Sequence, residues 1–138
     1  MKTTIKLFFF AAMISLFASC AKNPAKLLVS KDGIWTATAV TTIPGLGTYT
    51  DVNEITFSDG TGTTKDALGV TTTFTWSYDK KAEQMTITTV ESGNTTITIN
   101  AVSEIEKDSE KWNFVSGTLN GVTFTTADFT QVTTLVRK

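Results

Sequence analysis

The sequence predicts an all-β domain, an antiparallel meander β-barrel of eight or nine strands that follows a short N-terminal helical turn. Three observations carry this prediction. From Ile34 onward, apolar and polar residues alternate with period two, tight-turn signals separate the runs, and no long pattern of helical period occurs. Short strands without a covering helix bury one face by curling into a barrel or by stacking as two sheets. Closure removes exposed strand edges, so we favour the barrel over the sandwich.

The N-terminus has the pattern of an export signal. Two lysines in Met1–Lys6 precede the segment LFFFAAMISLFAS, which only Ser15 and Ser19 interrupt. A membrane-spanning helix needs about twenty apolar residues, so this segment is short for a permanent span. Its charged start and apolar centre fit a cleavable signal instead. We therefore expect residues 1–19 to be a signal peptide.

The only cysteine, Cys20, directly follows this segment. The stretch Leu16-Phe17-Ala18-Ser19-Cys20 resembles a bacterial lipobox, although Phe17 stands where leucine is usual. The resemblance implies that Cys20 is lipidated on its sulfur and becomes the new N-terminus, because the thiol is the acyl acceptor. The attached fatty chains would anchor the protein, so the membrane is an expected partner. The alternative is that Cys20 is an ordinary small residue after a signal that is cleaved elsewhere.

Residues 20–32 are expected to form a lipidated tether and a short helical turn. Asn23 before Pro24 fits an N-cap followed by the first residue of a helix, which would cover residues 24–30. The pair Asp32-Gly33 ends this turn, because the alternating pattern begins directly after it. The tether is therefore short, and the folded domain starts close to the anchor.

Residues 33–138 are expected to form the barrel. The clearest strand is VTTTFTWSY at residues 70–78, where the apolar residues share one face and Thr and Ser share the other. Turn signals such as Asn120-Gly121 lie between such runs, so neighbouring strands should pair antiparallel. The further strands are predicted at residues 34–40, 53–58, 61–66, 85–89, 96–100, 111–116, 121–125 and 130–137.

The larger side chains on the predicted inward faces are candidates for lining a cavity. They are Phe57, Phe74, Trp76, Tyr78, Met85, Ile87, Ile97, Ile99, Trp112 and Phe114. An eight-stranded barrel is either filled by its own side chains or holds one small ligand, so a filled core is an equal alternative. A pocket of about 300 Å³ or more, open at the end opposite Trp35, would favour ligand binding.

One motif at the start of the barrel points to a family. Gly33-Ile34-Trp35 resembles the G-x-W motif that opens the first strand of lipocalins. In that family the tryptophan closes one end of the barrel and an arginine from the last strand packs across it. The resemblance therefore implies that Trp35 and Arg137, the only arginine, touch as a structural pair at the barrel base. With the lipobox-like segment, the chain is similar to small lipocalin-like lipoproteins of Gram-negative bacteria.

Composition narrows the function. The formal net charge is −1 and the basic residues are scattered, so the chain lacks the basic stripe that nucleic-acid binders use, and we expect no nucleic-acid partner. Histidine is absent and cysteine occurs once, which removes the commonest general base and the usual transition-metal ligands. We expect no catalytic residues, no metal and no cofactor, and we interpret the protein as a non-enzyme.

Two functions remain open. The first is binding of a small apolar or amphipathic ligand inside a barrel that is lipid-anchored to the outer membrane, in the cell envelope. The second is a non-enzymatic surface or periplasmic scaffold whose filled barrel presents loops, especially residues 41–51, to a protein or glycan partner. No particular protein partner is indicated. A hydrolase that uses only carboxylates is a third and weaker interpretation.

Overall fold

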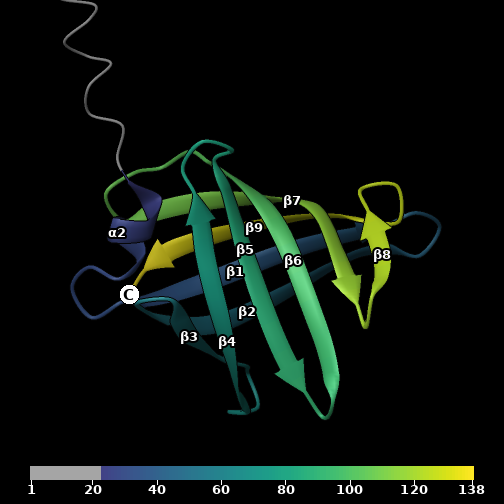
Figure 1. The fold of residues 1–138 in the computed structure, drawn as a ribbon, viewed down its shortest axis with the longest axis horizontal. Helices are drawn as coiled ribbons and strands as arrows, with labels where there is room; N and C mark the ends of the chain where they lie inside the picture. Colours follow the sequence, from purple (N-terminus) through teal and green to yellow (C-terminus); the bar gives the residue numbers. More distant parts are fainter. Residues whose placement is uncertain (1–22) are drawn as a thin grey trace, which may run out of the picture.

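The domain is an eight-stranded antiparallel meander barrel with one further strand outside it and a short helix at one end (Figure 1). The computed structural model describes residues 23–138, and the predictions for the signal peptide and Cys20 lie outside the described residues. No helix in the described part is long and apolar enough to span a membrane. The elements are α2 (Pro24–Leu28), β1 (Ile34–Ile43), β2 (Gly47–Ser58), β3 (Thr61–Lys65), β4 (Thr71–Asp79), β5 (Gln84–Glu91), β6 (Asn94–Ser103), β7 (Ser109–Leu119), β8 (Val122–Thr125) and β9 (Thr130–Arg137).

The strand order explains how the barrel closes. Hydrogen bonds join neighbours in the order β6-β5-β4-β3-β2-β1-β9-β7, and β6 also pairs with β7, so these eight strands form a ring. Every pair in the ring is antiparallel. β8 lies outside the ring and pairs with residues 116–119 of β7, whereas residues 109–113 of β7 pair with β9. The predicted meander barrel is confirmed.

All nine predicted strands are present among the described residues, but the first hairpin is longer than predicted. The β1–β2 ladder pairs Thr41 with Tyr49, and only residues 44–46 connect the two strands. Residues 41–51 are therefore mostly strand, and not the loop that the scaffold interpretation expects. Threonine, isoleucine and tyrosine on both sides of the Pro44-Gly45 turn favour extended backbone, so the ladder continues almost to the turn itself.

The helix α2 begins where the sequence predicts and ends earlier. The Oδ1 atom of Asn23 accepts hydrogen bonds from the backbone N–H groups of Ala25 at 3.1 Å and Lys26 at 3.4 Å, which makes Asn23 the N-cap. Pro24 occupies the first helical position, where its fixed φ suits the helix. The helix ends at Leu28, whose side chain is fully buried. α2 therefore packs into the end of the barrel that we call the base.

The main core lies next to α2 and is rich in aromatic rings. Phe57 is central to it, because its ring makes edge-on contacts with Phe74, Trp76 and Trp112 at centroid distances of 5.6, 5.7 and 5.9 Å. Such edge-to-face contacts are a favourable geometry for aromatic rings. The buried members of the core are Leu28, Trp35, Ala37, Phe57, Phe74, Met85, Val102, Trp112 and Leu135.

A second aromatic cluster explains the position of β8. The ring of Phe114 stacks on Phe129 at 4.5 Å and on Phe124 of β8 at 5.8 Å. Gly117 on β7 allows this approach, because a Cβ atom there would lie 2.6 Å from the Phe124 ring and 2.7 Å from the Ile97 carbonyl oxygen. β8 is thus fastened to β7 by backbone pairing and by three stacked rings, apart from the main core.

Candidate functional site

Trp35 and Arg137 close the base of the barrel. They are directly opposite in the β1–β9 ladder, and the guanidinium carbon of Arg137 lies 4.2 Å from the centroid of the Trp35 ring. The Trp35 side chain is fully buried, and its Nε1 donates a hydrogen bond of 2.9 Å to the Leu28 carbonyl oxygen. The contact predicted between Trp35 and Arg137 is therefore present.

Arg137 also ties the last strand to the end of α2. Its guanidinium donates hydrogen bonds of 2.9 Å to the Leu27 carbonyl oxygen and 2.8 Å to the Ser30 carbonyl oxygen. Its Nε donates to Asp108 Oδ1 at 3.0 Å. A hydrogen bond from Lys31, followed by a smaller contribution from that of Arg137, lowers the pKa of Asp108. Arg137 thus adds donors to carbonyl oxygens in and directly after the end of α2, which also accept hydrogen bonds from the turn that follows the helix.

A cavity of about 260 Å³ lies inside the barrel. Every ring strand except β4 contributes to its wall. The wall combines a few apolar side chains with many hydroxyl and amide groups. The lining residues are Ala37, Ala39, Asp51, Asn53, Ile55, Thr64, Ile87, Thr98, Asn100, Trp112, Gln131 and Thr133. The barrel is therefore filled next to α2 and hollow farther along its axis.

The polarity of the wall increases with distance from the base. The cross-strand pairs of β1 and β2, from the base outward, are Trp35–Ile55, Ala37–Asn53 and Ala39–Asp51. Trp35 is fully buried, whereas Asp51 is exposed. The cavity thus has an apolar floor that includes Ile55, Ile87 and Trp112, and the polar lining residues Asn53 and Asp51 lie farther from Trp35 along β2.

Asn100 is the most deeply buried polar side chain of the cavity wall. It is only 6% exposed, and no hydrogen bond joins its side-chain amide to another residue in the range 23–138. The only fully enclosed side-chain atom without a partner in this range is Glu110 Oε1, so the amide atoms of Asn100 face the cavity. Buried amides are normally hydrogen-bonded, and Asn100 therefore offers a donor and an acceptor to a molecule in the cavity.

A buried carboxyl group lies behind the cavity floor. The Nε1 atom of Trp112 donates a hydrogen bond of 3.0 Å to Oε2 of Glu110, a residue that is 1% exposed. Burial raises the pKa of Glu110 to about 7, and the Trp112 hydrogen bond and the charge of Arg137 partly oppose that shift. Glu110 therefore changes charge close to neutral pH.

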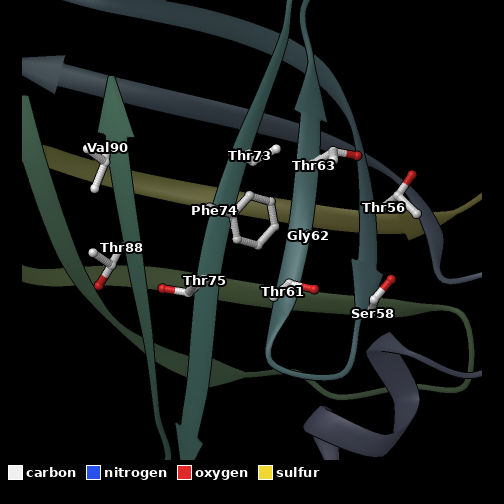
Figure 2. Close-up of a pocket in the computed structure, with 10 residues that line it drawn as sticks. All are labelled: Thr56, Ser58, Thr61, Gly62, Thr63, Thr73, Phe74, Thr75, Thr88 and Val90. Atoms are coloured by element: carbon white, nitrogen blue, oxygen red, sulfur yellow. The ribbon is translucent and has the colours of Figure 1, made fainter. Parts of the chain in front are cut away.

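The outer wall carries a larger groove, of about 450 Å³, across strands β2 to β5. Figure 2 shows the residues that line it: Thr56, Ser58, Thr61, Gly62, Thr63, Thr73, Phe74, Thr75, Thr88 and Val90. All of them are uncharged, and the strand register arranges the hydroxyls in rows, one of which is Ser58–Thr61–Thr75–Thr88. Outward positions of an antiparallel sheet commonly carry such residues because they face water.

The structure brings only part of the predicted cavity set to the cavity. Ile87 and Trp112 line the cavity. Five of the predicted residues instead fill or border the main core: Phe57, Phe74, Trp76, Tyr78 and Met85. Phe114 belongs to the second aromatic cluster. The structure does not place Ile97 and Ile99 at the cavity. The β5–β6 register pairs Ile87 with Thr98 and Met85 with Asn100, which places Thr98 and Asn100 inside the barrel. Their neighbours Ile97 and Ile99 therefore point to the outer face.

The polar residues of the wall are the ones that the sequence prediction missed. Asn53 has the same strand phase as Ile55 and Phe57, and Thr133 has the same phase as Leu135. Residues two positions apart on a strand share a face, so continuing the phase of the buried residues would have placed both polar groups inside. The strand phase of the neighbouring apolar residues is therefore the signal that identifies Asn53 and Thr133 as inward-facing.

Comparisons with known proteins identify no relative. No protein-family model, no curated protein and no solved structure matches the chain.

Proposed function

We propose that the protein is a membrane-anchored, lipocalin-like lipoprotein of the cell envelope that binds a small amphipathic molecule inside its barrel and catalyses no reaction. The observation that carries this proposal is the unpartnered amide of Asn100 in the cavity wall. The amide faces the cavity and bonds to no other residue in the described range, so a ligand can take both its donor and its acceptor.

The cavity defines the chemistry of the ligand. An apolar floor at Ile55, Ile87 and Trp112 below a wall of amides and hydroxyls fits an amphipathic molecule better than a wholly apolar one. The volume of about 260 Å³ falls short of the roughly 300 Å³ set above as favouring ligand binding, so the proposal rests on the chemistry of the wall and the ligand is smaller than a drug-sized molecule. Asp51 is the only charged lining residue, which disfavours an anion.

The test is native mass spectrometry of the full chain extracted from the cell envelope in mild detergent. We expect a bound small molecule, and we expect Asn100→Leu to reduce its occupancy about tenfold or more, because one buried hydrogen bond is lost at nearly constant side-chain size. Thr75→Val in the outer groove is the matched control and should retain the molecule. A chain that carries no small molecule, or an Asn100→Leu variant that keeps it fully, would contradict the proposal.

A second candidate function is binding of a neutral glycan in the outer groove, which is the scaffold interpretation in a narrower form. The rows of uncharged hydroxyls over β2 to β5 favour it, because each threonine can donate and accept a hydrogen bond. The same experiment separates the two functions. Loss of the bound molecule in Thr75→Val, with retention in Asn100→Leu, would support the groove and contradict the cavity.

The lipid anchor is proposed from Cys20 and the segment before it. Cys20→Ser removes the acyl acceptor, and each buried methylene of an acyl chain contributes about 0.8 kcal/mol to membrane binding. We therefore expect this variant to leave the membrane fraction, as measured by fractionation and immunoblotting. Ser15→Ala, within the same apolar segment, is the control and should stay in the membrane fraction. Unchanged membrane association of Cys20→Ser would contradict lipidation.

A further inference from the structure

We infer that Glu110 is a positioning residue for the interior cavity, which it controls through Trp112, so that gain or loss of one proton changes ligand affinity. The inference rests on the proposed function, because it concerns the same cavity. Glu110 itself does not line the cavity, whereas Trp112 both lines it and donates its indole N–H to Glu110. A change at the carboxyl group therefore reaches the ligand through the ring that forms part of the floor.

The hydrogen bonds around Glu110 depend on whether its carboxyl group is protonated. Its Oε2 accepts the Trp112 bond, and its Oε1 has no partner among residues 23–138. In the charged state the Trp112 bond is charge-assisted and stronger, and the indole is held more firmly. In the neutral state the carboxyl is a weaker acceptor and carries a proton with no acceptor in place. The two proton states thus differ in the bond that positions the indole and in the charge behind the cavity floor, and that charge sets the direction of the coupling.

The charged and titratable groups around Glu110 come from two other strands. Arg137 on β9 favours the charged carboxylate, whereas the burial of Glu110 disfavours it more strongly and raises its pKa to about 7. Tyr78 on β4 has its pKa raised, chiefly by burial and then by the charges of Glu83, Glu110 and Asp79. Tyr78 is neutral near pH 7, so Glu110 is the group of this set that changes charge there.

The direction of the coupling follows from solvation. A neutral ligand on the floor displaces polarisable water from beside the indole, which further disfavours a charged carboxylate behind it. The ligand therefore binds the protonated form better, and affinity falls as the pH rises through 7. Folding stability changes with pH in the same direction as ligand affinity. A carboxyl whose pKa is raised in the folded state contributes most stability at pH values below its unfolded pKa, and this contribution is lost as the pH rises through about 7.

The three indole N–H groups provide the readout. Trp35 donates to a backbone carbonyl and Trp76 to two, whereas Trp112 donates to a carboxyl group. In NMR spectra of the ¹⁵N-labelled full chain between pH 5 and 9, we expect the Trp112 indole signal to titrate with a midpoint near 7. The signals of Trp35 and Trp76 serve as internal references. Glu110→Gln should abolish the titration, and Glu106→Gln, at an exposed carboxylate, should preserve it.

Ligand coupling is measured with benzyl alcohol, a small neutral probe with an apolar ring and one hydroxyl. We expect its affinity to fall about fivefold from pH 6 to pH 8, the lower end of typical coupling between sites, and to be independent of pH in Glu110→Gln. A Trp112 signal that does not titrate, or an affinity that does not change with pH, would overturn the inference while leaving the proposed function in place. A probe that binds at no pH, with Trp112 still titrating, would instead contradict the proposed cavity function and its coupling together.

Discussion

Replacing Trp35 by alanine is expected to lower the free energy of unfolding by about 3–5 kcal/mol, the usual cost of removing a large buried aromatic side chain. The Trp35 side chain is fully buried at the base, and its loss opens a cavity among Leu28, Ala37 and Leu135 in the main core. The Leu28 carbonyl oxygen loses its hydrogen bond from the indole. Urea denaturation followed by circular dichroism, at one pH, measures the effect.

A double-mutant cycle separates the indole–guanidinium contact from the loss of packing. Trp35→Ala, Arg137→Met and the double variant should give non-additive costs, with a coupling of about 0.5–2 kcal/mol for a cation over an aromatic face. Trp35→Phe keeps a ring but lacks the N–H group, so it should cost less than alanine. If the two single costs simply add, the 4.2 Å contact carries no energy of its own and Arg137 acts only through its bonds to α2.

The barrel was predictable because a single physical rule, alternation of side chains on a strand, applies over most of the chain. The rule placed Phe74 and Trp76 on the core face and located every strand. Because the connecting turns are short, consecutive strands pair antiparallel as a meander. The N-cap at Asn23 was equally local, since its side chain bonds to N–H groups two and three residues ahead. Features that depend on neighbouring residues in the sequence could therefore be predicted.

The cavity was not predictable in the same way, because it depends on where polar residues fall in the register between strands. Ile97 and Ile99 are apolar and alternate cleanly, yet their strand presents Thr98 and Asn100 to the interior. A shift of one residue exchanges the two faces, and nothing in a threonine-rich strand specifies which face is buried. The partner strand decides it, since Met85 is fully buried and lies opposite Asn100. The long-range pairing, and not the composition of β6, defines the wall.

Gly33→Ala is expected to destabilise the domain by about 2–5 kcal/mol, although it adds a single methyl group. Gly33 has a φ of +64°, which costs about 1–2 kcal/mol in a residue with a Cβ atom. The new Cβ would also lie far inside van der Waals contact with the Phe57 carbonyl oxygen, a backbone atom that cannot turn away. Overpacking of this kind adds about 1–3 kcal/mol. The measurement is again the urea-induced unfolding transition.

Gly121→Ala is the matched control, because it isolates backbone strain from the clash. Gly121 has a φ of +83° and nothing within 4 Å of the position of a Cβ atom, so it should show only the strain of about 1–2 kcal/mol. The excess cost at Gly33 then measures how rigidly the start of β1 is held against Phe57, whose N–H donates a 2.8 Å hydrogen bond to the Gly33 carbonyl oxygen. Equal costs for the two variants would mean that this junction yields, and that Trp35, two residues further on, is not fixed by it.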